Sequence, residues 1–168
     1  NSWYDPEGEK AAAQTLLDMD CDVIAQHCDT VYPQSLAQER GVYSIGYNSD
    51  MSKDAPEACL CSVIWNWSAY YTAAVQSVIE GTWDGSNYYG GMSENLVNIT
   101  SLADFCAEGT AEKVEEARAA ILSGANGVFD GVIETNTGDT VGEEGKTLDD
   151  ATITGGINWY FKTVSVVD

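Results

Sequence analysis

The chain has 168 residues, 44% of them hydrophobic, so it is long enough and apolar enough for one domain with a buried core. Its 27 acidic and 7 basic residues give a formal net charge of −20. Nucleic acid and anionic membrane surfaces repel such a chain, and we expect no nucleic-acid partner.

Helices and strands are expected to alternate along the chain. Asp5 and Pro6 are typical of a helix start, and apolar spacing from Ala12 to Leu17 indicates the first helix. The later segments follow in chain order: a strand (21–27), a helix (32–41), two strands (42–47 and 60–65), a helix (68–81), two weaker strands (87–91 and 95–100), a helix (110–124), a hairpin turning at 137–139 (131–141), and an apolar segment that suits a strand or a helix (157–167).

Two of the expected helices carry an apolar face. On the helix over 68–81 this face runs from Tyr71 to Ile79, and Gly81 follows its end. The helix over 110–124 has Val114, Ala117 and Ile121 on one side, which we expect to face a core.

The alternation of strands and helices favours an α/β fold with a doubly wound parallel sheet. Only four residues precede the first helix, so the first strand of such a sheet is absent from the chain. A sheet without its first, central strand is expected to show an open apolar slot. We therefore expect the natural protein to extend upstream.

Polar and aromatic residues gather where the expected strands end. Because the carboxyl ends of parallel strands meet at one edge of a sheet, we expect them to form one small-molecule site there. The groups are Trp3 and Tyr4, then Gln26, His27 and Asp29, then Asn48 and Asp50, and finally Trp65 to Trp67.

The cysteines and the single histidine favour no metal centre and no cofactor. Five cysteines are an odd number, and Cys59 and Cys61 form a C-x-C pair without a second matching pair. His27 and Cys28 are adjacent, so in a strand they point to opposite faces and make a poor catalytic pair. We expect the thiols to serve mainly as small buried apolar groups.

Five stretches, "NSWYDPEGEKAAAQTLLD", "DVIAQHCDT", "GVYSIGYNSDM", "SVIWNWSAYYTAAVQSVIEGTW" and "YYGGM", closely resemble the carboxyl-terminal part of the basic membrane lipoprotein family. These are substrate-binding proteins of ABC importers, similar to purine nucleoside receptor lipoproteins. The resemblance implies a type I periplasmic-binding-protein fold with a flavodoxin-like sheet in each lobe. It implies that residues 1–168 are most of the carboxyl-terminal lobe, that the amino-terminal lobe is absent, and that one lobe alone binds ligand weakly.

The resemblance also implies roles for single residues. Trp3 falls where the family places an aromatic ring that stacks on a purine, and Asp50 where it places an aspartate that binds ribose hydroxyls. Trp65 falls roughly where nucleoside-binding members carry a lysine, which favours a free base such as adenine. Gln26, His27 and Asp29 stand in place of a glycine-rich loop and close the pocket.

The function that the resemblance implies is capture of a purine base or nucleoside for a membrane ABC permease. The protein is then a monomer outside the cell or in the periplasm, anchored by a lipidated N-terminus that this chain does not contain. Two other classes stay open: an α/β enzyme acting on nucleosides, and a ligand-responsive sensor domain. The enzyme is disfavoured because the sequence offers no aspartate-rich metal motif.

Overall fold

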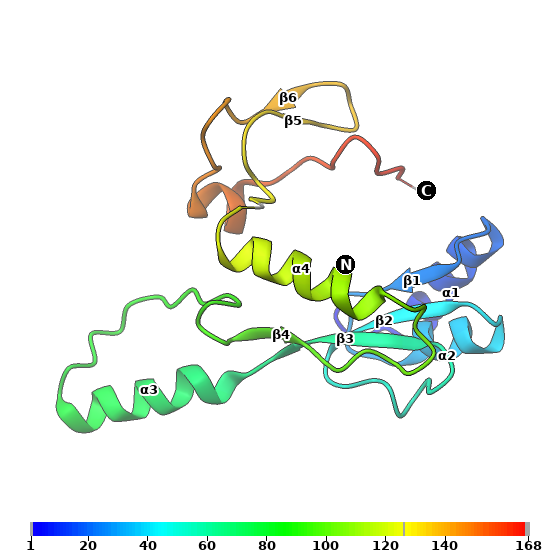
Figure 1. Cartoon of the computed structure of the whole chain (residues 1–168), viewed down its shortest axis with the longest axis horizontal. Helices are drawn as coiled ribbons and strands as arrows, with labels where there is room; N and C mark the ends of the chain where they lie inside the picture. The colour runs from blue at the N-terminus through cyan, green and yellow to red at the C-terminus, as the bar shows by residue number, and fades with distance from the viewer. Residues whose placement is uncertain (1, 126, 167–168) are drawn as a thin grey trace. The chain divides into compact units, whose positions relative to one another are not determined.

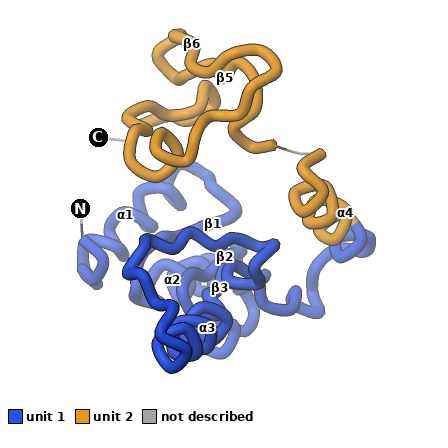
Figure 2. Tube along the Cα trace, turned by 90° about the vertical axis from the view of Figure 1, so that its left-hand side faces the viewer, with its two compact units in different colours: residues 1–112 blue, residues 113–168 orange. Residues whose placement is uncertain are grey.

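The computed structural model describes residues 2–125 and 127–166. The chain divides into two compact units, residues 1–112 and 113–168 (Figure 2). Helix α4, Thr110–Leu122, begins in the first unit and continues into the second.

The first unit is built on a four-stranded sheet in the order β1-β2-β3-β4 (Figure 1). The strands are β1, Val23–Ala25; β2, Tyr43–Asn48; β3, Cys59–Trp65; and β4, Val97–Ile99. The first three are parallel, as predicted, and β4 pairs antiparallel with β3. The described strands of this sheet lie side by side in the order in which they follow in the sequence.

No gap separates β1 from β2 among the described residues, although a hollow of about 200 Å³ beside α1 and β1 is lined by Ala13, Leu16 and Ile24 among others. Strand β1 pairs directly with β2, with Val23 opposite Tyr43 and Ala25 opposite Ile45. The backbone hydrogen bonds of these two strands therefore close the place where a central strand was expected.

Helices α1, Pro6–Asp18, and α2, Tyr32–Glu39, form the core together with the sheet. As predicted, Asp5 caps α1: its Oδ1 accepts from the Gly8 N–H at 3.1 Å. Helix α2 packs on β1 and β2, and α1 packs on α2. The buried apolar residues of this core come from both helices, two strands and the loop after β2: Ala13, Leu17, Ile24, Leu36, Ala37, Met51, Ala55, Ala58 and Cys59.

Helix α3, Trp67–Glu80, forms where it is predicted and ends at Gly81, whose φ of 72° suits a residue without a side chain. Its predicted apolar face is nevertheless exposed, and no residue of α3 is buried. The same holds for α4, so the prediction that Val114, Ala117 and Ile121 face a core is wrong. Periodicity gave the correct helices because it depends on the chain itself, whereas burial depends on a partner surface.

The predicted weak strand at 87–91 does not form. The backbone there is irregular, and its last residue joins the turn over 92–95: the Gly91 N–H donates to Glu94 Oε2 at 2.8 Å, and the Gly91 carbonyl accepts from the Leu96 N–H at 3.0 Å. These bonds occupy the N–H and the carbonyl of Gly91, which a strand would need for pairing.

The second unit contains the predicted hairpin, formed by β5, Ile133–Glu134, and β6, Thr140–Val141. A short π-helix follows at Thr152–Gly156. The apolar segment beyond it forms neither a regular strand nor a helix over 157–166, although Phe161 makes an isolated antiparallel bridge with Thr135. Residue 167, the last of the predicted segment, lies outside the described residues.

Candidate functional site

Four rings meet at the carboxyl edge of the first sheet. His27 lies two residues past β1, Tyr47 is next to last in β2, Trp65 ends β3, and Trp3 lies in the connection before α1. We call these four residues the aromatic cluster. The closest ring centroids are those of His27 and Tyr47 at 4.2 Å, while Trp3 lies 5.5 Å from His27 and Tyr47 lies 6.1 Å from Trp65.

The rings of the aromatic cluster have a definite arrangement. Trp3 and Tyr47 lie 6.4 Å apart with only 19° between their planes, so their faces have nearly the same orientation. His27 stands edge-on to both, at 82° to Trp3 and 90° to Tyr47. Trp3 is 61% exposed. The cluster therefore presents a broad aromatic surface to which a flat apolar molecule can stack.

Polar groups border the aromatic cluster. The Asp29 N–H donates to the Trp3 carbonyl at 2.9 Å and fixes the backbone that carries this ring. Asn48 Nδ2 donates to Asp29 Oδ1 at 3.4 Å, which joins the ends of β1 and β2. Both side chains are exposed, so their remaining donor and acceptor sites face solvent.

Gln26, although predicted in the site, has its side chain engaged internally. Its Nε2 donates to the Thr30 carbonyl at 2.8 Å and lies 3.1 Å from the Met51 sulfur, and its Oε1 accepts from the Cys28 thiol at 3.0 Å. These bonds shape the loop from 26 to 30 that carries His27 and Asp29. Gln26 thus positions the loop instead of presenting a free amide.

A carboxylate supports this loop from helix α1. Glu9 Oε1 accepts from the Asp5 N–H at 2.8 Å, and its Oε2 accepts from the Thr30 hydroxyl. Burial raises the pKa of Glu9, but the hydrogen bonds from Asp5 and Thr30 outweigh burial and hold that pKa below its usual range. Burial, together with the neighbouring Glu9 carboxylate, raises the pKa of Cys28 to about 11. Cys28 is therefore a protonated structural thiol.

Asp50 lies in the loop after β2, two residues beyond Asn48. Its Oδ1 accepts from the Ser52 N–H at 3.0 Å, and hydrogen bonding with Ser52 lowers the pKa of this carboxyl. Asp50 lines a separate hollow of about 440 Å³ whose walls include Cys59, Cys61 and Phe105 and none of the other six predicted site residues.

Tyr47 was missed as a site residue in the sequence, where it is the last residue of the strand expected over 42–47. Its position gave a signal that could have identified it. Tyr47 stands beside Asn48 at the end of β2, and β2 lies between β1, which leads to His27, and β3, which ends at Trp65. In the described part of the chain, no group of three or more His, Cys, Asp or Glu side chains is placed to hold a metal ion.

The mixed α/β fold of this chain, with its mainly parallel sheet, is also the fold of solved ABC transporter solute-binding proteins. Solved structures with this fold include ABC transporter solute-binding proteins from Aeropyrum pernix K1 (TM-score 0.60, 18% identity) and Conexibacter woesei (TM-score 0.58, 16% identity). A transcriptional activator of the comK gene from Bacillus halodurans is also similar (TM-score 0.67, 18% identity). Each match covers 74% of this chain and 42–45% of the other chain.

Within that class, the chain belongs to the Bmp family, described as ABC transporter substrate-binding protein PnrA-like, whose family model matches residues 1–128. A purine-binding protein of Brucella abortus is 36% identical over 160 residues, which are 95% of this chain and 45% of that protein. A putative ABC transporter glucose-binding protein of Haloferax volcanii is 38% identical over 96 residues, which are 57% of this chain and 25% of that protein. The chain thus spans less than half the length of either relative.

Proposed function

We propose that this chain is part of the solute-binding component of an ABC importer and that its aromatic cluster binds a purine base or purine nucleoside. The observation that carries the proposal is the near-parallel orientation of the exposed Trp3 ring and Tyr47 at the sheet edge. Membership of the substrate-binding family and the similarity to a purine-binding relative support it.

The proposed mechanism is binding without bond chemistry. The purine stacks on Trp3, an interaction worth about 1–3 kcal/mol for a nucleobase on an aromatic side chain. Asp29 accepts a hydrogen bond from the ligand and Asn48 donates one, at the border of the cluster. We propose that a second lobe, supplied by residues outside this chain, closes on the ligand by a hinge motion. Without that lobe the chain binds more weakly, because half of the contacts are missing.

Among purines, we propose a preference for the free base. Trp65 stands edge-on to Tyr47 at 89°, and its large ring occupies space beside the stacking surface that a ribose would need. Asp50, the sugar ligand that the family resemblance implies, lines another hollow and is not included in the proposed site.

The proposed partner is a membrane ABC permease, and the proposed location is the periplasm or the cell exterior. The lipid anchor also remains a proposal. Among the described residues, none of the helices combines the length and the apolar character needed to cross a bilayer.

Ligand-observed NMR with adenine, hypoxanthine, inosine and guanosine tests the proposal, since it detects complexes with millimolar affinity. We expect saturation transfer to the bases, and we expect Trp3→Leu to weaken their binding at least about tenfold. Trp83→Leu is the matched control, because Trp83 is a half-exposed tryptophan in the loop after α3 and lies outside the aromatic cluster. Trp65→Ala should raise the affinity for nucleosides relative to bases.

Two results would overturn the proposal. One is an absence of saturation transfer to any of the four compounds while the Brucella relative responds under the same conditions. The other is an equal loss of binding in Trp3→Leu and Trp83→Leu, which would place the ligand elsewhere. Conversion of inosine to hypoxanthine in the same samples would show an enzyme in place of a binding protein.

A further inference from the structure

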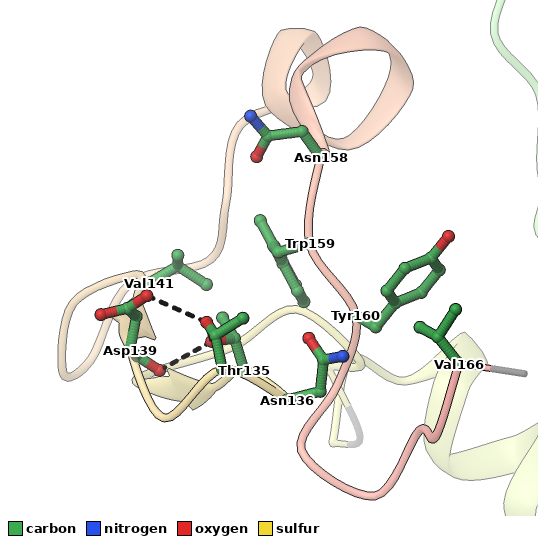
Figure 3. A pocket seen from close by; sticks show the side chains of 9 residues that line it. Thr135, Asn136, Asp139, Val141, Asn158, Trp159, Tyr160 and Val166 are labelled. Atoms are coloured by element: carbon green, nitrogen blue, oxygen red, sulfur yellow. Dashed lines mark hydrogen bonds between the residues drawn. The ribbon is translucent and has the colours of Figure 1, made fainter. Parts of the chain in front are cut away.

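The second unit contains a hollow that belongs to neither the aromatic cluster nor the family-matched residues 1–128. Its volume is about 430 Å³, within the roughly 300–1,000 Å³ of small-molecule sites. Figure 3 shows Trp159 in the middle of the lining side chains, with Asp139 and Val141 of the hairpin on one side and Tyr160 on the other.

Backbone hydrogen bonds hold the two walls of this hollow together. One wall is the β5–β6 hairpin, and the other is the extended segment from 158 to 166. The Asn136 N–H donates to the Tyr160 carbonyl at 2.9 Å, and the Lys162 N–H donates to the Glu134 carbonyl at 3.0 Å. An ion pair between Lys162 Nζ and Glu134 Oε2 at 3.1 Å adds a side-chain contact.

The hairpin wall carries a hydrogen-bonded polar group. Thr137 Oγ1 donates to Asp139 Oδ2 at 2.9 Å and lies 2.9 Å from Thr135 Oγ1. These bonds fix the Asp139 carboxylate and leave its Oδ1 as an acceptor. Within the described residues, the side-chain amides of Asn136 and Asn158 take part in no hydrogen bond, so each offers both donors and an acceptor.

We propose that this hollow binds a neutral, polyhydroxylated small molecule of the size of a monosaccharide. A hydroxyl is both a donor and an acceptor, which matches the carboxylate of Asp139 and the amides of Asn136 and Asn158. The half-buried Trp159 ring packs against the apolar C–H face of such a molecule. An anionic ligand is disfavoured, because the chain carries a net charge of −20 and Asp139 lines the hollow.

Two-dimensional NMR of the full chain tests this proposal, with glucose, galactose and ribose as probes. We expect saturable shifts of the Trp159 indole N–H and of the Asn136 side-chain amide. Asn136→Ala should weaken binding about tenfold, because it removes a hydrogen-bonding partner of the ligand. Asn87→Ala, an exposed asparagine of the first unit, is the matched control and should leave the sugar affinity unchanged.

The outcomes separate this proposal from the purine site. A second site is supported if the sugars shift only resonances of the second unit and if Asn136→Ala leaves purine binding unchanged. The proposal is overturned if no probe shifts second-unit resonances at millimolar concentration, or if acetate or an alkylamine produces the shifts and the sugars do not. If Asn136→Ala disturbs folding, Asn158→Ala gives the same test at an exposed position.

Discussion

Helices α2 and α3 differ in a way that their sequences do not suggest. Helix α2 has eight residues, and Pro33, Gln34, Leu36 and Ala37 are buried. Helix α3 has 14 residues and a more apolar composition, yet none of them is buried, and Ile79 is 74% exposed. The difference lies in the partner: α2 packs on β1 and β2, whereas α3 has no comparable packing on another helix or strand in the part of the chain that the structure describes.

The comparison teaches that an apolar face stabilises a fold only where another surface covers it. Hydrophobic stabilisation follows the area removed from water, about 25 cal/mol per Å². The apolar residues of α2 have gained that energy, and those of α3 have gained little. The predictions below sharpen this contrast, from the largest expected effect to the smallest.

The largest effect is expected for truncation of the α2 face. Leu36 is 5% exposed and belongs to the core, so Leu36→Ala should lower the free energy of unfolding by about 2–5 kcal/mol. Ile79→Ala on α3 removes a similar volume from a solvent-exposed position and should change it by less than about 0.5 kcal/mol. Urea denaturation followed by circular dichroism measures both values.

Equal effects of the two substitutions would break the comparison. A large loss for Ile79→Ala alone would mean that α3 is covered in solution. Because a covering surface could come from association between copies, both variants should be measured at several protein concentrations.

A second prediction concerns close packing within the sheet. A Cβ placed on Gly46 would collide with the Ser62 hydroxyl and lie 3.1 Å from the Met51 Cβ. The Ser62 hydroxyl also accepts from the Met51 N–H at 3.1 Å, so its displacement breaks a buried bond. Gly46→Ala should therefore destabilise the protein by about 1–3 kcal/mol. Thermal unfolding tests this.

Gly155→Ala is its control, because nothing lies within 4 Å of a Cβ at that position. Its melting temperature should match that of the parent or exceed it slightly, since alanine restricts the unfolded chain. A loss as large as that of Gly46→Ala would refute the explanation by close packing.

The sequence predicts local features well, because their causes lie within a few residues. Asp5 caps α1 and Gly81 ends α3 as expected. It also places His27 and Trp65 correctly at strand ends. The surroundings of Asp50 are harder to predict, because the chain turns back after β2, where Met51 enters the core and Asp50 lines another hollow. That turn depends on packing between distant segments, which periodicity does not describe.

A third prediction follows from the raised pKa of Cys28, in the loop between β1 and α2. Burial and the Glu9 carboxylate raise this pKa to about 11, whereas the pKa of a cysteine thiol in an unfolded chain is about 8.5. The folded state therefore holds this proton more tightly than the unfolded state does. Its contribution to stability is complete below the unfolded pKa and is lost as the pH rises toward about 11.

The change is on the order of 1 kcal/mol, because solvent screens this partly exposed thiol. Denaturation at a series of pH values should show a smaller alkaline loss of stability for Cys28→Ser than for the parent. If the free energy of unfolding falls with pH equally in Cys28→Ser and in the parent, the pKa of Cys28 is not raised. Tyrosine and lysine titrate in the same range, so the difference between the two proteins is the quantity to compare.

The smallest effect is expected for Ser44, which is fully buried in β2 and whose hydroxyl has no hydrogen-bond partner among the described residues. Ser44→Ala removes this unsatisfied group and should leave the free energy of unfolding unchanged or raise it by up to about 1 kcal/mol. Ser62 is equally buried, but its hydroxyl accepts from Met51, so Ser62→Ala should cost about 1–3 kcal/mol. If the two substitutions change the free energy of unfolding equally, the Ser44 and Ser62 hydroxyls are equally well hydrogen-bonded. If Ser62→Ala costs stability and Ser44→Ala does not, the Ser44 hydroxyl contributes nothing to the free energy of unfolding. The region around α2 is then stabilised by apolar burial despite this unpaired hydroxyl.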